Sequence, residues 1–308
     1  MSFAETFFSA LGGTGAAVLI LGYLARNFLE NRLRKDLKDH EAINRDWENQ
    51  RKIELNEQAD IRETVKKYSR IILVSASDLQ DRLWHLCERQ SKSKNKVLLA
   101  EDENAQMYGS WPMTKRHYLI SSMYLFARYF FWIEVLKREV RFLEFSEDDK
   151  TNVFNYHVKK VERMFAETSL QQFAKNRIST DKPVFQLMQS EIGDALAETE
   201  VNASQTISFH RFRINYDEIA ASNEGLVQLA DLLKGAMSDA KSNFCLRRLK
   251  LICNSLHDLV LFLHEHNNLS PAEGLERVSV PSFDENEFEK LWPSSPNNLI
   301  QPTSYVSG

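Results

Sequence analysis

The sequence contains little cysteine, glycine or proline: 3, 10 and 7 residues respectively among 308. Cys87, Cys245 and Cys253 form no CxxC pair and no metal-ligand spacing. Such a sparse, odd set favours a reducing compartment over a disulfide framework, and we expect three buried thiols. With so few helix breakers and so many Leu, Glu, Lys and Arg residues, the predicted fold class is all-α.

The motifs that mark common enzymes and cofactor sites are also missing. The glycine-rich run at residues 12–15 lacks the lysine of a phosphate-binding loop, and no HExxH, GxSxG, kinase or deaminase signature occurs. The histidines at 257, 264 and 266 do not have metal-ligand spacing. The net charge of −4 provides no basic field for nucleic acid. We therefore predict no catalytic site, cofactor, metal or nucleic-acid partner.

A charge-free run of nineteen residues, 7–25, lies near the N-terminus. As a helix it would span about 28 Å, close to the roughly 30 Å hydrocarbon core of a bilayer. A cleaved signal peptide is disfavoured because no basic residue precedes the run. A buried soluble helix is disfavoured by the length of the run and its lack of charge. We predict that residues 1–25 form a transmembrane anchor in the lipid bilayer.

Five basic residues follow this run and none precedes it, which indicates its direction. By the positive-inside rule, the N-terminus lies outside and the bulk of the chain stays in the cytoplasm. The predicted localisation is therefore the inner (cytoplasmic) membrane, with a single pass. The five residues are Arg26, Arg32, Arg34, Lys35 and Lys38.

Small residues repeat every four positions in the anchor, at Ser9, Gly13 and Ala17. This spacing lets two helix backbones approach closely in lipid, so it predicts an anchor-pairing face and self-association. Glycine and alanine are also common in membrane helices generally, and an anchor without pairing is the alternative.

Residues 26–67 mix both signs of charge and contain no glycine or proline. This pattern predicts a solvated helical stalk supported by ion pairs four residues apart. Its heptad frame is apolar only at the ends, so weak coiled-coil pairing and docking on its own domain are both open. We predict a cytoplasmic multi-helix bundle over residues 68–290 and a disordered tail over 291–308.

Residues 117–145 are the most apolar segment after the anchor. Part of it, residues 118–136, has the length of a second membrane span, but Arg128 would lie at its centre. A mid-bilayer arginine costs at least about 2.5 kcal/mol on insertion scales, so we predict a core helix instead. Residues 207–216 are rich in aromatics and predict an extended piece or an aromatic-rich link, the one place where the pattern leaves room for a short strand.

Charged residues interrupt the apolar stretches and form the best candidate site. They could converge in a pocket between helices and bind a charged ligand; a hydrolase would require four of them, at 78, 128, 134 and 194, to meet there. The alternative is a set of ion pairs that fix helix register, with Glu134 and Arg138 one such pair. We favour this alternative, because buried charges are usually paired for structural reasons. The candidate residues are Asp78, Arg82, Arg128, Glu134, Arg138 and Asp194.

Three stretches, at residues 10–41, 75–83 (SASDLQDRL) and 124–144, are similar to segments of an uncharacterised family of bacterial membrane-anchored helical proteins. Residues 189–196 show a fainter similarity. The resemblance implies a single-pass topology and an α-helical cytoplasmic domain, and it implies no activity.

Two functions fit these features. The first is a membrane-tethered binding or scaffold protein, or a sensor, that recruits a cytoplasmic protein partner through its helical domain. The second is a membrane-acting effector in stress or phage defence, whose anchors oligomerise and perturb the bilayer; this idea rests on analogy.

Overall fold

The computed structural model describes residues 3–94, 96–99, 113–139, 149–168, 181–198, 205–238, 244–267, 269 and 276–280. For residues 3–22, 24, 25, 31, 36, 39, 42, 99 and 149 it describes the backbone alone. The described residues are mostly helical and include no strand, which confirms the all-α class. One isolated antiparallel bridge joins Ala197 and Thr206. The chain divides into two compact units, Met1–Ala59 and Asp60–Gly308.

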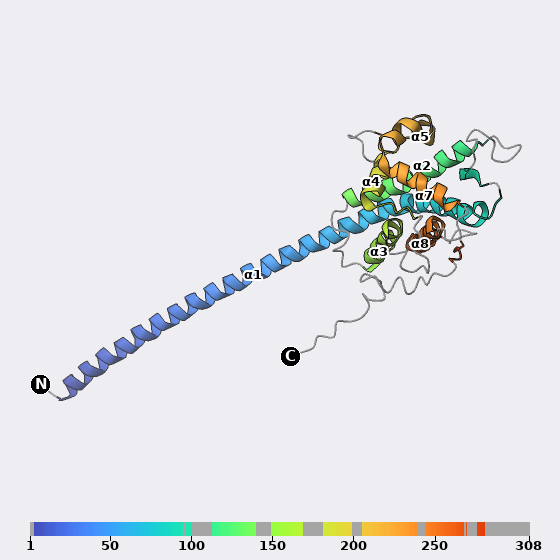
Figure 1. The fold of residues 1–308 in the computed structure, drawn as a ribbon. Coiled ribbons are helices and arrows are strands. Elements are labelled where there is room, and N and C mark those ends of the chain that lie inside the picture. The colour runs from blue at the N-terminus through green and yellow to red at the C-terminus, as the bar shows by residue number, and fades with distance from the viewer. Residues whose placement is uncertain are drawn as a thin grey trace. The chain divides into compact units, whose positions relative to one another are not determined.

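Helix α1, Phe3–Trp84, is one unbroken helix of 82 residues that begins in the first unit and ends in the second (Figure 1). Its continuity follows from its composition, because residues 26–84 contain neither glycine nor proline. In the first unit, Arg26 pairs with Glu30 at 3.0 Å and Arg45 with Glu41 at 3.8 Å. These are ion pairs at the spacing expected of a solvated helix.

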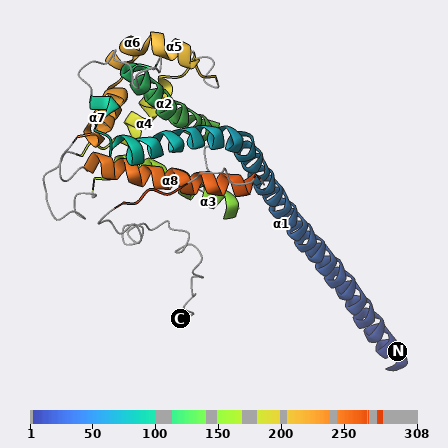
Figure 2. The same cartoon turned by 90° about the vertical axis from the view of Figure 1, so that its right-hand side faces the viewer.

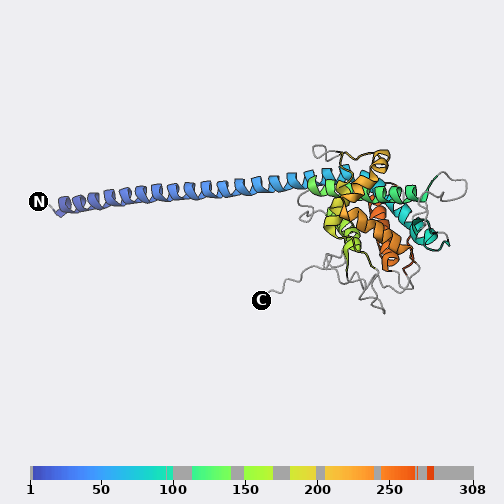
Figure 3. The same cartoon turned by 45° about the horizontal axis from the view of Figure 1, so that its top comes forward.

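The second unit contains the remaining helices. The last part of α1 lies between α2 and α8 there (Figure 2). Helix α5 lies at the edge of the unit, on the side of α2 opposite α3 and α8 (Figure 3). In chain order the elements after α1 are a π-helix η1 (His85–Gln90), a 3-10 turn η2 (Val97–Leu99), α2 (Lys115–Glu139), α3 (Asp149–Ala166), α4 (Gln186–Asp194), α5 (Phe209–Ile214), α6 (Tyr216–Ala221), α7 (Glu224–Ala236) and α8 (Phe244–His266).

Helix α2 is the central helix of the second unit. Among the residues whose side chains the structure describes, it is the one helix long and apolar enough to cross a membrane, and most of its apolar stretch is buried inside this unit. Phe126 and Phe130 meet Phe165 of α3 edge to face, with ring centroids 5.9 and 5.0 Å apart. Such burial is that of a core helix, as the arginine at its centre suggested.

Short polar side chains set the helix boundaries. Thr114 Oγ1 accepts a hydrogen bond from the backbone N–H of His117 at 3.1 Å and caps α2. Asn223 Oδ1 accepts from the N–H of Leu226 at 2.8 Å and starts α7 as a separate helix from α6. No strand or extended link forms over most of residues 207–216, because Ser208 Oγ accepts from the N–H of Arg211 at 3.3 Å and begins α5.

Helix α8 has the apolar stripe that its sequence predicts. Phe244, Leu249, Ile252, Leu256, Leu259 and Leu263 are all buried. The three cysteines are buried thiols, as expected, and burial raises the pKa of Cys253 to about 12 and that of Cys245 to about 11. The predicted tail, residues 291–308, lies outside the described residues.

Candidate functional site

The charged residues that the sequence singled out form separate links between helices. Arg128 of α2 pairs with Asp78 of α1, and Arg138 of α2 pairs with Asp194 of α4 at 2.6 Å. Asp78, Arg138 and Asp194 have side chains about half exposed, and the side chain of Arg128 is 23% exposed. Exposed pairs of this kind contribute about 0–1 kcal/mol each. Within the described part of the chain, no hydrogen bond or ion pair joins these two links into one site.

Glu134 does not pair with Arg138. Its carboxylate accepts from Lys137 at 2.9 Å, and the same lysine lies 2.5 Å from Glu162 of α3. Glu162 is the most buried of the three, with a side chain 10% exposed. Burial raises its pKa, and the nearby Lys137 ammonium opposes that rise. Sequence reasoning missed Glu162, because only the packing of α3 against α2 brings it to this lysine.

Arg82 fastens the end of α1 to the first turns of α2. Its Nη1 donates to Ser121 Oγ at 2.9 Å and to Ser122 Oγ at 2.8 Å, and its guanidinium lies 4.4 Å from the centroid of the Tyr118 ring. Burial lowers the pKa of Arg82. These neutral partners indicate a structural clamp between two helices.

We predict that acid weakens the fold through His85, whose Nδ1 lies 2.8 Å from Tyr118 Oη. Burial, then Arg89 and Arg82, lower the pKa of His85. The unfolded chain therefore binds the proton first as pH falls below about 6.5, so stability is complete above that pH and is lost below it. Chemical denaturation between pH 7.5 and 5.5 should show the wild-type advantage over His85→Gln shrinking with acid. An advantage that grows with acid would contradict this assignment.

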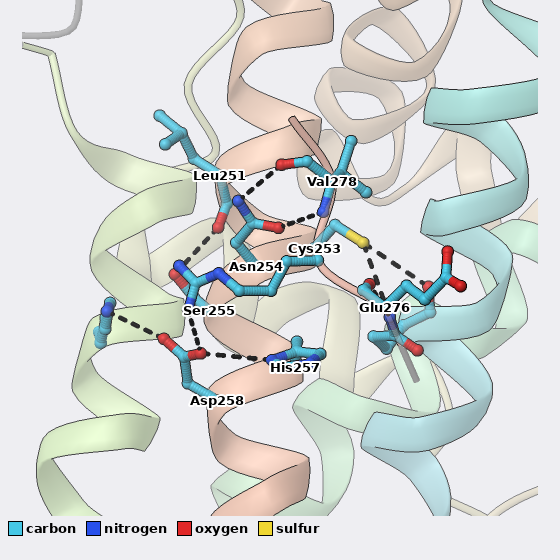
Figure 4. A network of polar contacts seen from close by, with 11 residues as sticks. Leu251, Cys253, Asn254, Ser255, His257, Asp258, Glu276 and Val278 are labelled. Carbon is cyan, nitrogen blue, oxygen red and sulfur yellow. Dashed lines mark hydrogen bonds and ion pairs between the residues drawn. The ribbon is translucent and has the colours of Figure 1, made fainter. Parts of the chain in front are cut away.

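The most specific polar contacts on the second unit hold a short C-terminal segment, residues 276–280, which we call the strap. The strap has no helical or strand structure. The side-chain amide of Asn254, on α8, makes both hydrogen bonds to the peptide of one strap residue (Figure 4). Asn254 Nδ2 donates to Val278 O at 3.0 Å, and the Val278 N–H donates to Asn254 Oδ1 at 2.8 Å. One amide thus satisfies the backbone as a neighbouring strand would.

Two further side chains hold the strap by its backbone. Lys250 Nζ donates to the carbonyl of Ser279 at 2.9 Å, and Gln80 Nε2 of α1 donates to the carbonyl of Glu276 at 3.4 Å. We call Gln80, Lys250, Asn254 and Asp258 the strap site. Contacts to backbone carbonyls and N–H groups do not depend on which residue carries them. Gln80, Lys250 and Asn254 therefore recognise an extended backbone and not its side chains.

Two contacts depend on the side chains of the strap. Val278 is 3% exposed and packs into the core, whereas its neighbours on both sides are exposed. Arg277 Nη1 lies 2.6 Å from Asp258 Oδ1, and Asp258 also lies 3.2 Å from Lys160 of α3. The strap site therefore accepts a basic residue followed directly by a small apolar one.

The strap is held by forces that are close to balance. A buried valine contributes about 1.5–3 kcal/mol, and each hydrogen bond about 0.5–1.5 kcal/mol. Ordering the backbone costs roughly 1–2 kcal/mol for each residue of the strap. Because the two sides are of similar size, the strap can open without unfolding of the helices beneath it.

The chain matches no family model, no curated protein and no solved structure. Its similarity to the bacterial membrane-anchored family stays a prediction from the three stretches that carry it. Among the described residues, no group of three or more His, Cys, Asp or Glu side chains is placed to hold a metal ion. The contacts themselves carry the functional argument.

Proposed function

We propose that this chain is a membrane-tethered binding protein, anchored by residues 1–25 in the inner membrane, with a helical unit that binds a polypeptide partner in the cytoplasm. The observation that carries the proposal is α1, because one unbroken helix connects the charge-free run to the buried core of the second unit.

The contacts of the second unit support binding as its role. Five of the six charged residues that could have served catalysis, all but Glu134, are engaged in contacts between helices. The strap site presents side chains that hold an extended backbone. A helical unit with a surface that accepts an extended chain is the arrangement of a binding or scaffold protein.

The anchor supplies the tether and a means of association. Its length matches the bilayer core, and the basic residues that follow it favour retention of the second unit in the cytoplasm. Ser9, Gly13 and Ala17, whose side chains lie outside the described residues, supply a face along which two anchors could pair.

We predict that Ala16→Arg, at the middle of the charge-free run, removes the protein from the membrane. A charge at the centre of a span costs about 2.5–3.5 kcal/mol on insertion scales. The protein should shift from the carbonate-resistant membrane fraction to the soluble or aggregated fractions. Asn44→Arg, at an exposed position of α1, is the matched control and should stay with the membrane. Equal membrane retention of the Ala16→Arg variant and the wild type would refute the anchor.

A further inference from the structure

We propose that the strap is an internal ligand, which occupies a site for an extended partner peptide carrying a basic residue directly before a small apolar residue. The proposal deepens the proposed function and rests on it, since it names the class of partner that the tethered unit binds. It starts from the kinds of atoms that hold the strap. Most of the polar bonds go to its backbone, and a partner with another sequence could accept them equally well.

The amide of Asn254 is the element that defines an extended ligand. It donates to a carbonyl and accepts from an N–H of the same residue, Val278. A helical ligand residue would already use both groups within its own helix, so it could not form this pair of bonds. Asn254 itself is 3% exposed, hence a ligand that left it would uncover a buried amide. Some extended chain is therefore needed to cover this position.

Specificity comes from charge and from size. Asp258 lies against Arg277 at 2.6 Å and favours a cation at that position of the ligand. A carboxylate there would repel Asp258, even though Lys160 remains beside it at 3.2 Å. The next position of the ligand, which Val278 occupies here, is buried, since Val278 is 3% exposed. That position therefore takes a small apolar side chain.

The strap competes with such a partner because it presents the same features from within the chain. Its buried contribution is one valine, with Val280 partly buried beside it. The exposed side chains of Glu276 and Ser279 add nothing to the core. A partner that offers the same backbone and a matching pair of side chains can therefore replace the strap. The unit would then exist in a closed form, with the strap in place, and an open form that binds the partner.

The test uses the full chain in detergent and a fluorescent peptide with the sequence of residues 273–283. We compare the wild type with Val278→Asp, which places a charge in the buried position of the strap and releases it. The peptide should bind the released chain at least tenfold more tightly than the wild type. Adding Asn254→Ala to the released chain should lower that affinity at least tenfold. Ser255→Ala is the matched control and should change nothing, because the Ser255 hydroxyl donates to Leu251 O of its own helix at 2.9 Å.

Two further variants keep the test decisive. If Val278→Asp disturbs the fold, Arg277→Glu in the chain releases the strap from the exposed side without altering the core. In the released chain, a peptide with Glu in place of Arg277 should bind at least tenfold more weakly, and Asp258→Asn should abolish that difference.

Three results would overturn the proposal. Equal peptide binding by the wild type and the released chains would show that the strap does not occupy the site. Folded, released chains that bind no peptide would show that the site does not work in trans. A wild-type dimer whose hydrogen-exchange protection at Val278 falls on dilution would assign the site to the strap of a second copy. The tether is judged separately, because peptide binding in detergent does not depend on insertion in a membrane.

Discussion

Replacing Arg248 with methionine should lower the free energy of unfolding by about 3–5 kcal/mol, the largest loss we expect from any single substitution in this chain. Arg248 on α8 is fully buried, and the Asp181 side chain that pairs with it is 2% exposed. Nε and Nη2 donate to the two carboxylate oxygens at 2.9 and 2.6 Å. Without the guanidinium, a buried carboxylate would be left with no countercharge.

The same guanidinium also caps a helix. Nη1 donates to the carbonyls of Met164 and Phe165 at 2.6 and 2.9 Å, and Nη2 donates to the carbonyl of Glu167 at 2.6 Å. These carbonyls end α3 and have no partner further along that helix. A cation at the C-terminus of a helix also complements its dipole. The methionine variant would remove one hydrogen bond from each of these three carbonyls, although Phe165 O would keep the bond that it accepts from the Val184 N–H at 2.8 Å.

Denaturant unfolding of the full chain, followed by tryptophan fluorescence, measures this loss. Arg248→Lys should recover only part of the stability, because an ammonium has three donors and cannot reproduce the planar fork. Arg211→Met is the matched control, since Arg211 pairs with Glu198 at 3.3 Å on the surface. That variant should lose less than about 1 kcal/mol. A buried-site variant that unfolds at the same denaturant concentration as the surface control would contradict the structural role of Arg248.

The second large effect is expected at Gly225, where α7 crosses α4. A Cβ atom at this position would lie 2.5 Å from the backbone carbonyl oxygen of Met188 and 2.9 Å from Ile192 Cγ1. Backbone cannot move aside as a side chain can, so Gly225→Ala must push the two helices apart. Overpacking of this kind costs about 1–3 kcal/mol, more than the roughly 1 kcal/mol by which alanine favours a helix over glycine.

Gly235→Ala, in the same helix, is the matched control. Its Cβ would meet the side chain of Cys245, with Sγ at 2.8 Å, which can shift by rotation. We expect this variant to unfold within about 1 kcal/mol of the wild type, because the propensity gain offsets the contact. The denaturation midpoints of the two variants should therefore differ clearly. Equal midpoints would show that α4 and α7 are not packed as closely as the structure places them.

The parts of the fold that depend on local sequence could be predicted. The stripe on α8 follows from apolar residues at helical spacing, and the cap at Thr114 follows from a short polar side chain before an apolar run. The segment at 207–216 shows how a local rule can fail. Its aromatics favour a strand, but the hydroxyl of Ser208 accepts from the backbone and starts a helix.

The candidate site could not be predicted, because its contacts join residues far apart in the sequence. Arg248 binds a carboxylate 67 positions earlier, and Asn254 binds the backbone of a segment whose sequence carries no signal for that contact. The one local hint is that both are polar residues on a mostly apolar helix. Five of the six charged residues chosen from the sequence make contacts between helices, and Glu134 pairs within its own helix.

Fractionation of the full chain beside a chain that starts at Lys38 tests the central claim, a helical unit tethered by its N-terminus, most directly. The shortened chain keeps the whole second unit and lacks the charge-free run. We predict that the full chain stays in the carbonate-washed membrane pellet and requires detergent for release, whereas the shortened chain is soluble and folded. A full chain that is soluble without detergent would contradict the account.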